Sequence, residues 1–185
     1  MRIARKLKAD REIIKGFIAV LGNGMIELSS NKLARPEFFI LAYKFISEYI
    51  EGGFFKKESM LIKALEDLGF PTDNGPIGFV LSEQKKSKEA SVQMVGAAKA
   101  WQDGDEVARK DVGWAASEYT TTMRQHLERL KTLIFPLLEQ NLAIEDEHKL
   151  SEEFDAIIFG GDRQNAPDNY KKLIVTLEEE LEDWR

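Results

Sequence analysis

Residues 11–25, with the sequence REIIKGFIAVLGNGM, decide the fold class. Apolar side chains recur there at spacings of three and four residues, at Ile13, Ile14, Phe17, Ile18, Leu21 and Met25. This spacing places them on one face of an α-helix and differs from the alternation of a half-buried strand. The stretch therefore predicts an amphipathic helix over about residues 7–28.

Three more segments show the same periodicity, over about residues 36–68, 76–102 and 105–141. Gly52-Gly53 lies inside the first of them and Pro136 lies near the end of the last, so a local kink is expected at both places. Long helices with short connections favour antiparallel neighbours. We therefore predict an all-α fold, an up-down-up-down antiparallel four-helix bundle over about residues 5–141.

Beyond Asn141 the periodic segments are shorter. An acidic helix is predicted over about residues 147–158 and a last helix over about 167–184, with turn-forming residues at 159–162 between them. These C-terminal helices, within about residues 147–185, are expected to pack across one end or side of the bundle. The length of 185 residues suits one core, so residues 1–185 are predicted to form a single domain.

The composition limits the classes of function. Acidic residues number 32 against 26 basic ones, with a net charge of -6 and no basic stripe, which argues against a nucleic-acid partner. The absence of cysteine excludes disulfides, thiolate metal sites and cysteine nucleophiles. No apolar run approaches the roughly 20 residues of a membrane span. We expect a soluble, cytoplasmic protein without a membrane segment, for which a protein partner or a homo-oligomer stays open.

Each predicted long helix has one polar residue on its apolar face: Asp10, Glu58, Gln84 and His126. A buried carboxylate needs a metal, a proton or hydrogen-bond donors, and carboxylates with an imidazole form metal sites in helical bundles. Structural roles are open as well. Asp10 could cap a helix, and Glu58 could turn towards solvent. Gln84 could bond a backbone group, and His126 could donate to Glu58.

Two stretches resemble the hemerythrin, or HHE cation-binding, family, whose four-helix bundles hold an oxo-bridged pair of irons. Residues 75–84, GPIGFVLSEQ, are similar to the start of the family's third helix, which ends in Glu-His. The second stretch is His126 followed nine residues later by Phe135-Pro136. The resemblance covers about residues 5–158 and implies a hemerythrin-like bundle.

The resemblance also implies where metal ligands would lie. The family has a histidine on the first helix, His-x-x-x-Glu on the second and fourth, and a histidine on the third. These positions fall on Asp10, Phe54, Glu58, Gln84, His126 and Leu130. Only Glu58 and His126 keep the family's residue types, and the side chains of Phe54 and Leu130 cannot bind a metal. The usual di-iron site is therefore not expected.

Two main hypotheses follow for the function. In the favoured one, the bundle binds no metal, Glu58 and His126 form a hydrogen-bonded pair, and the protein is a non-enzymatic scaffold or a binding or sensing module. In the other, Asp10, Glu58, Gln84 and His126 bind one divalent ion, iron, manganese or zinc, in metal, redox or small-gas sensing or storage. A small organic ligand in the emptied core is a third. An enzymatic role is not expected, because the sequence shows no nucleophile with an adjacent base.

Overall fold

The computed structural model describes residues 1–157 and 167–185, and every regular element in them is helical. The elements are α1 (Arg2–Ser30), α2 (Pro36–Phe45), η1 (Ile46–Phe54), α3 (Phe55–Asp67), α4 (Gly75–Gln102), α5 (Ala108–Arg129), η2 (Leu130–Ile134), α6 (Phe135–Asn141), α7 (Ile144–Asp155) and α8 (Pro167–Trp184), where η marks a π-helix. The all-α prediction is confirmed for these residues. The predicted turn at 159–162 lies outside them.

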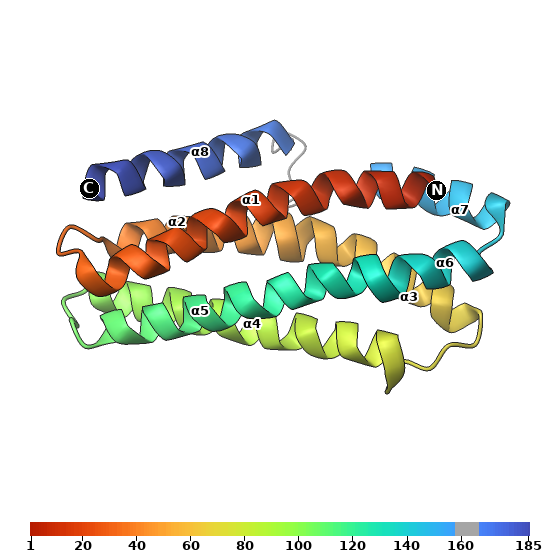
Figure 1. Ribbon diagram of the computed structural model, residues 1–185, viewed down its shortest axis with the longest axis horizontal. Helices are drawn as coiled ribbons and strands as arrows, with labels where there is room; N and C mark the ends of the chain where they lie inside the picture. The colour runs from red at the N-terminus through yellow and green to blue at the C-terminus, as the bar shows by residue number, and fades with distance from the viewer. Residues whose placement is uncertain (158–166) are drawn as a thin grey trace.

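Four helical rods lie side by side along the long axis of the molecule (Figure 1). They are α1, the continuous rod α2–η1–α3, α4, and the continuous rod α5–η2–α6. The connections at residues 31–35, 68–74 and 103–107 alternate between the two ends of the molecule, so successive rods run in opposite directions. This arrangement is consistent with an antiparallel bundle.

The second and fourth rods contain π-helical turns where the sequence weakens an α-helix. η1 includes Gly52-Gly53, whose helix propensity is poor. η2 ends just before Phe135-Pro136, and Pro136 has no N–H and would crowd the carbonyl of Thr132 in a regular α-helix. Both rods continue through a wider turn at the two places where a kink was expected. π-turns occur frequently at functional sites. The residues next to these two segments are therefore candidates for such a site.

Glycine ends the second rod and begins α4. Gly69 and Gly75 have positive φ angles of 96° and 67°, a backbone region that side chains with a Cβ rarely adopt. The amide of Gly69 donates to the carbonyl of Glu66, which completes a hydrogen bond at the end of α3. Pro76 then occupies the first turn of α4, as its fixed φ favours. These residues fix where the chain reverses between the rods.

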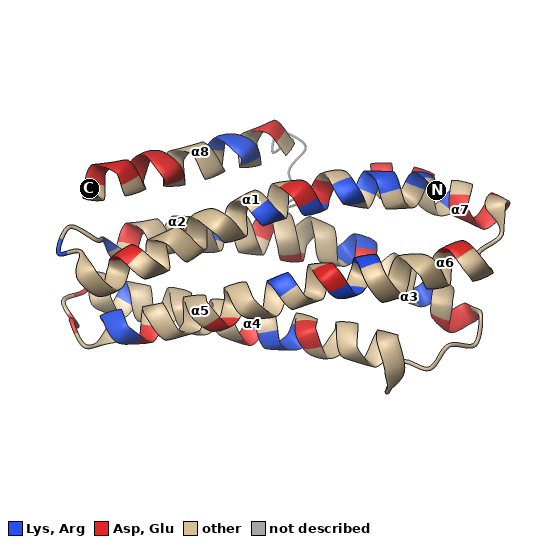
Figure 2. Cartoon of the chain, in the orientation of Figure 1, with Lys and Arg blue, Asp and Glu red and all other residues tan. Residues whose placement is uncertain are grey.

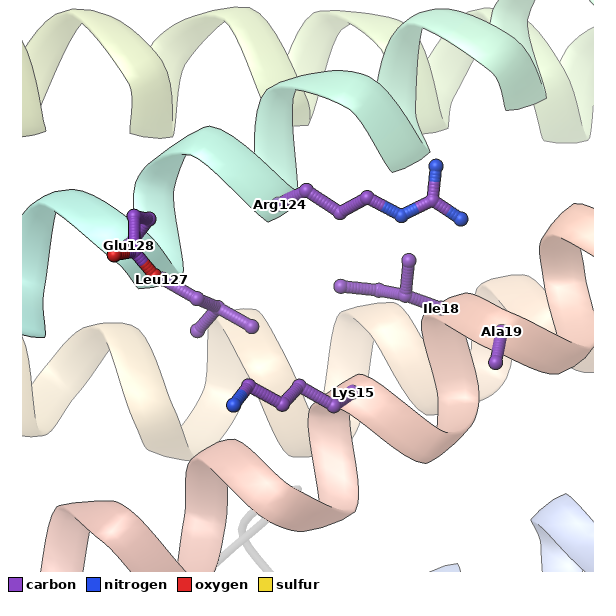
Figure 3. A pocket seen from close by; sticks show the side chains of 6 residues that line it. All are labelled: Lys15, Ile18, Ala19, Arg124, Leu127 and Glu128. Atoms are coloured by element: carbon purple, nitrogen blue, oxygen red, sulfur yellow. The ribbon is translucent and has the colours of Figure 1, made fainter.

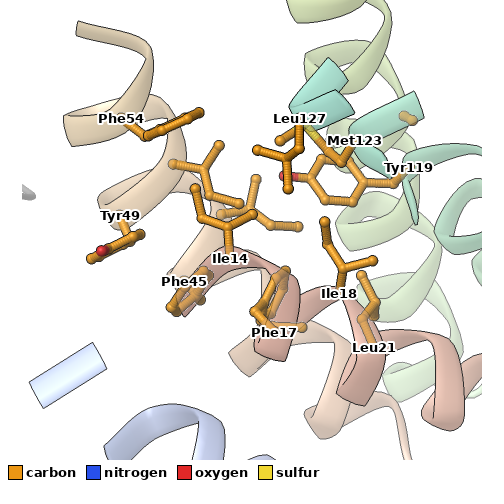
Figure 4. Packing of buried hydrophobic residues seen from close by; sticks show 14 of the residues in the cluster. Ile14, Phe17, Ile18, Leu21, Phe45, Tyr49, Phe54, Tyr119, Met123 and Leu127 are labelled. Atoms are coloured by element: carbon orange, nitrogen blue, oxygen red, sulfur yellow. The ribbon is translucent and has the colours of Figure 1, made fainter. Parts of the chain in front are cut away.

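The core lies along the facing sides of the rods. Figure 4 shows side chains from α1, from α2–η1 and from α5 converging on it, and these are all at most 2% exposed: Ile14, Phe17, Ile18, Leu21, Phe45, Tyr49, Phe54, Tyr119, Met123 and Leu127. The rings of Phe17 and Phe45 stack at a centroid distance of 4.2 Å. Burial of aromatic and branched side chains is the main favourable term in folding.

Two further helices cover the outside. α7, which begins three residues earlier than predicted, places buried Glu147 against the start of α1, where Glu147 Oε1 accepts from the amide of Ile3 at 2.9 Å. α8 lies along α1 and α2 (Figure 1). Its buried residues are Tyr170, Ile174, Leu177, Leu181 and Trp184, and the Trp184 ring packs 5.1 Å from that of Phe38. The last helix therefore packs against the side of the rods, which is one of the two positions expected for the C-terminal helices.

Residues of both charge signs are interspersed along the helices (Figure 2). One helix, α1, contains an 18-residue window of mean hydropathy 1.3, so its length and composition alone would suit a membrane crossing. A share of 44% of that window is buried inside the structure, and the core helix of a soluble protein meets the same criterion. The absence of a membrane segment stays a prediction.

Candidate functional site

Three of the four predicted inward polar residues meet in the core. Glu58 from α3, Gln84 from α4 and His126 from α5 are 1%, 8% and 0% exposed, and Glu58 contacts both Gln84 and His126. Glu58 and His126 lie close to the two π-helical segments, since Glu58 follows η1 and His126 precedes η2. The alternative in which Glu58 turns to solvent is wrong.

Both carboxylate oxygens of Glu58 have a partner. His126 Nε2 lies 2.6 Å from Glu58 Oε1, and Gln84 Nε2 donates to Glu58 Oε2 at 2.5 Å. Gln84 therefore bonds a side chain, and not the backbone group considered above. Hydrogen bonds to a charged group are the strong ones in a dry core, so this carboxylate is held in place by donors from two other rods.

His126 lies between two carboxylates. On the side away from Glu58, its Nδ1 is 3.6 Å from Glu83 Oε1, a distance too long for a good hydrogen bond. Burial by itself would lower the pKa of His126, but the charge of Glu58, its hydrogen bond to the imidazole and the nearby charge of Glu83 outweigh burial and raise the pKa to about 9. The imidazole is therefore positively charged at neutral pH, and a cation lies in the centre of the core.

Glu83 and Arg129 connect the cluster of Glu58, Gln84 and His126 to the surface. The sequence analysis did not single out these two residues. Arg129 Nε donates to Glu83 Oε1 at 2.9 Å, and the Arg129 guanidinium lies 4.7 Å from the ring of Phe79, which is 53% exposed. Burial raises the pKa of Glu83, but His126 and Arg129 lower it further, so that the net direction is down. The only sequence signal for this role was the position of Glu83 next to Gln84.

Asp10 belongs to a different cluster. It lies well inside α1, so the helix-cap alternative is wrong. Asp10 Oδ2 accepts from Lys57 Nζ at 2.6 Å, and Asp10 Oδ1 accepts from the hydroxyl of Tyr49 at 3.0 Å. Lys57 immediately precedes Glu58, but its side chain contacts α1, whereas that of Glu58 contacts α4 and α5. The two clusters therefore share a rod but not a site, and the predicted set of four residues does not assemble.

Phe54 and Leu130, the positions where the family resemblance lacks ligands, are both 0% exposed. Phe54 is the last residue of η1 and Leu130 is the first of η2. Their apolar side chains therefore contribute to the packed core beside Glu58 and His126. Apolar volume occupies the positions from which a histidine and a glutamate would extend in the family pattern.

The core side chains that could serve as metal ligands do not converge on one point. In the described residues, no group of three or more histidine and acidic side chains has an arrangement that could hold a metal ion. Glu58 and Glu83 lie on opposite sides of the His126 ring, and Asp10 is bound to Lys57. The geometry is that of an ion-pair array.

Comparisons with known proteins add no assignment: no family model, no curated protein and no solved structure matches this chain.

Proposed function

We propose that the chain is a hemerythrin-like, up-down-up-down four-helix bundle in which a hydrogen-bonded core replaces the metal site, and that it is a non-enzymatic scaffold or binding module. One observation supports this most directly. Both oxygens of Glu58 are taken by side chains of this chain, His126 Nε2 at 2.6 Å and Gln84 Nε2 at 2.5 Å. The residues that would bind a metal satisfy one another.

The energetics favour this arrangement. A divalent ion would have to displace a proton from His126, whose pKa is raised to about 9, and both hydrogen bonds of Glu58. It would gain no ligand from Phe54 or Leu130. Two large apolar side chains are exposed on the surface, Val107 at 76% and Trp114 at 77%. These features suit a structural or binding role.

The second candidate is a site for one divalent ion, iron, manganese or zinc. A specific observation favours it: Glu58, Gln84 and His126 come from three rods, and Glu58 lies within hydrogen-bond distance of both of the others. Two of the three are strong ligand types, and a small shift of Gln84 would turn its oxygen towards the centre. Without Asp10 the set has three members, which leaves any ion with few protein ligands.

Metal analysis distinguishes the two candidates. The protein, purified without added metal and then incubated with iron(II), manganese or zinc, should retain well below one ion per chain after gel filtration. The His126→Ala variant and the matched control His148→Ala, which changes the exposed histidine, should give the same result. A stoichiometric ion that is lost in His126→Ala and retained in His148→Ala would refute the metal-free function.

Restoring the ligands tests the hemerythrin-like register. Changing Phe54 and Gln84 to histidine and Leu130 to glutamate together places donors at the positions that the resemblance implies. We expect this triple variant to bind iron if the four rods have the proposed register. A folded variant that binds no iron would contradict the register, and circular dichroism would establish that it is folded.

A further inference from the structure

A groove lies between α1 and α5 on the outside of the bundle. Its lining residues are Lys15, Ile18, Ala19, Arg124, Leu127 and Glu128 (Figure 3). The groove has a volume of about 220 Å³. Ile18 and Leu127 are each 2% exposed, whereas the charged side chains of the lining are exposed. The base of the groove is therefore apolar and its edges are charged.

Basic side chains continue the α1 edge of the groove towards the N-terminus. One stripe of exposed residues follows spacings of three and four: Arg5, Lys8, Glu12, Lys15 and Ala19. This spacing places them on one face of the helix. Since Lys15 and Ala19 line the groove, the same face borders it. The stripe is about 21 Å long at roughly 1.5 Å per residue.

The other edge of the groove is formed by α5 and η2. Arg124, Glu128 and Lys131 are exposed at spacings of four and three residues, and the first two line the groove. The side chain of Arg124 extends over α1, because a Cβ atom at Gly22 would lie 3.3 Å from Arg124 Nη2. The rods run in opposite directions, so Lys131 lies towards the Lys8 end of the stripe.

These two edges carry more positive than negative charge. We call their five basic residues the basic face: Arg5, Lys8, Lys15, Arg124 and Lys131. Only two acidic residues, Glu12 and Glu128, belong to the same stripes, so three cations remain even if each carboxylate neutralises one. Glu12 lies 3.5 Å from Lys15, and both carboxylates also act on the buried guanidinium of Arg11.

The basic face contrasts with the net charge of -6 of the whole chain. Basic segments of α1 and of α5 appear together on the side turned to the viewer in Figure 2. The two segments are more than 100 residues apart in the sequence, so the surplus exists only where the rods pack against each other. A surface of this kind attracts and orients an acidic partner.

We propose that the basic face docks an acidic amphipathic helix of a partner protein. The carboxylates of that helix contact the basic side chains, and its apolar residues lie along Ile18, Ala19 and Leu127. Helices bind in this way to grooves with an apolar base. Complementary charges at the edges fix the orientation of the bound helix and speed its association.

Two other kinds of partner fit the surface less well. Within the described stretches 5–19 and 117–132, no large apolar or aromatic side chain is exposed. A surface that binds membranes inserts such side chains into the lipid, and single-stranded nucleic acid stacks its bases on aromatic ones. The overall charge of -6 also opposes binding to a long polyanion.

Fluorescence anisotropy with a synthetic peptide tests the basic face. The probe is a labelled helix-forming peptide of glutamate and leucine, about 15 residues long to match the stripe, with its leucines at helical spacing. This peptide should bind the parent protein saturably. Added sodium chloride should weaken the binding, because salt screens exposed charges. A peptide with lysine in place of glutamate should not bind.

A pair of charge reversals locates the binding. Lys8→Glu combined with Arg124→Glu should weaken binding of the glutamate–leucine peptide by about tenfold or more, since like charges then face the peptide. The matched control combines Lys44→Glu with Lys99→Glu, which makes the same change in net charge at two exposed lysines of a separate groove between α2 and α4. The control should bind within about twofold of the parent. Circular dichroism checks that both variants are folded, as expected for exposed positions.

Several results would overturn the proposal. Equal weakening in the two double variants would show that net charge alone explains the binding. Equal binding of a peptide with serine in place of leucine would show that the apolar base takes no part. Tighter binding of phosphatidylserine vesicles or of a thymidine oligonucleotide would assign the face to that class of partner. No saturable binding of the glutamate–leucine peptide up to about 1 mM would leave the face without a function in docking.

This inference rests on the proposed role as a binding module, but it uses none of the core residues Glu58, Gln84 and His126. The metal analysis and the peptide titration therefore report separately. A chain that retains an ion and binds the peptide would lose the metal-free core and keep the docking face. A chain that binds neither would keep the metal-free core and lose the docking face.

Discussion

Raising the pH from 6 to 9.5 should remove the stability that protonated His126 gives to the fold. The charges of Glu58 and Glu83 raise the pKa of this buried imidazole from the ordinary 6.5 to about 9. Between these two values the folded chain binds a proton that the unfolded chain has lost. The stabilisation is therefore complete below pH 6.5 and disappears as the pH rises through about 9.

The size of the effect follows from the two pKa values. A difference of one pKa unit corresponds to about 1.4 kcal/mol, so a rise from 6.5 to about 9 amounts to about 3 kcal/mol of unfolding free energy. Domains are typically stable by about 5–15 kcal/mol. The loss should therefore be a substantial part of the total stability and easy to measure.

Urea denaturation followed by circular dichroism measures this dependence. Unfolding free energies at half-unit steps from pH 6 to 9.5 should fall with a slope that approaches one proton per chain, about 1.4 kcal/mol per pH unit. His126→Gln cannot titrate and should lose this slope, whatever its overall stability. His148→Gln, the matched control at the exposed histidine, should keep it.

Two results would contradict a protonated His126 in the folded protein. One is a parent protein whose stability does not change between pH 6.5 and 9. The other is a nitrogen NMR spectrum that shows a neutral His126 ring at pH 7. In that case the two carboxylates beside the imidazole, those of Glu58 and Glu83, would not keep it protonated.

Three further predictions concern stability. The hydroxyl of Tyr119 is fully buried with no hydrogen-bond partner among the described residues, so Tyr119→Phe should raise the unfolding free energy by about 1 kcal/mol; a loss in urea denaturation would contradict this. Lys57→Met should cost about 3–5 kcal/mol because it leaves Asp10 unpaired, and adding Asp10→Leu should restore most of it; equal stability of the single and double variants would argue against the pair. Trp184→Ala should cost about 3–5 kcal/mol by emptying the contact with Phe38, and a melting temperature within a degree of the parent value would show that α8 is not anchored there.

Helical periodicity predicted the rods well. The apolar spacing around Phe17 and the Pro76 start signal gave helices that the structure contains, since both depend on residues within one or two turns. The segments at Gly52-Gly53 and Pro136 were expected to be irregular, but the form of the irregularity was not foreseen. A π-turn depends on how the rest of the rod is held by its neighbours, which local sequence does not contain.

For the polar residues too, the sequence predicted burial but not the contacts that they make. Periodicity placed Asp10, Glu58, Gln84 and His126 on inward faces, and the structure buries all four of them to 8% exposure or less. The sequence did not predict that Asp10 would bond Lys57, because this contact depends on how α1 and α3 are placed against each other. Lysine can bury its stem and still reach a carboxylate across a helix interface.

The helices and the side chains that face inwards could be predicted from the amino-acid pattern alone, because both follow from a repeat of 3.6 residues. Which of these side chains meet depends on the packing of the rods. Glu58 and His126 are 68 residues apart in the chain, and their contact depends on the rotation and axial offset of separate rods. The same offset pairs Asp10 with Lys57 and separates it from Glu58, so the four inward residues form two clusters.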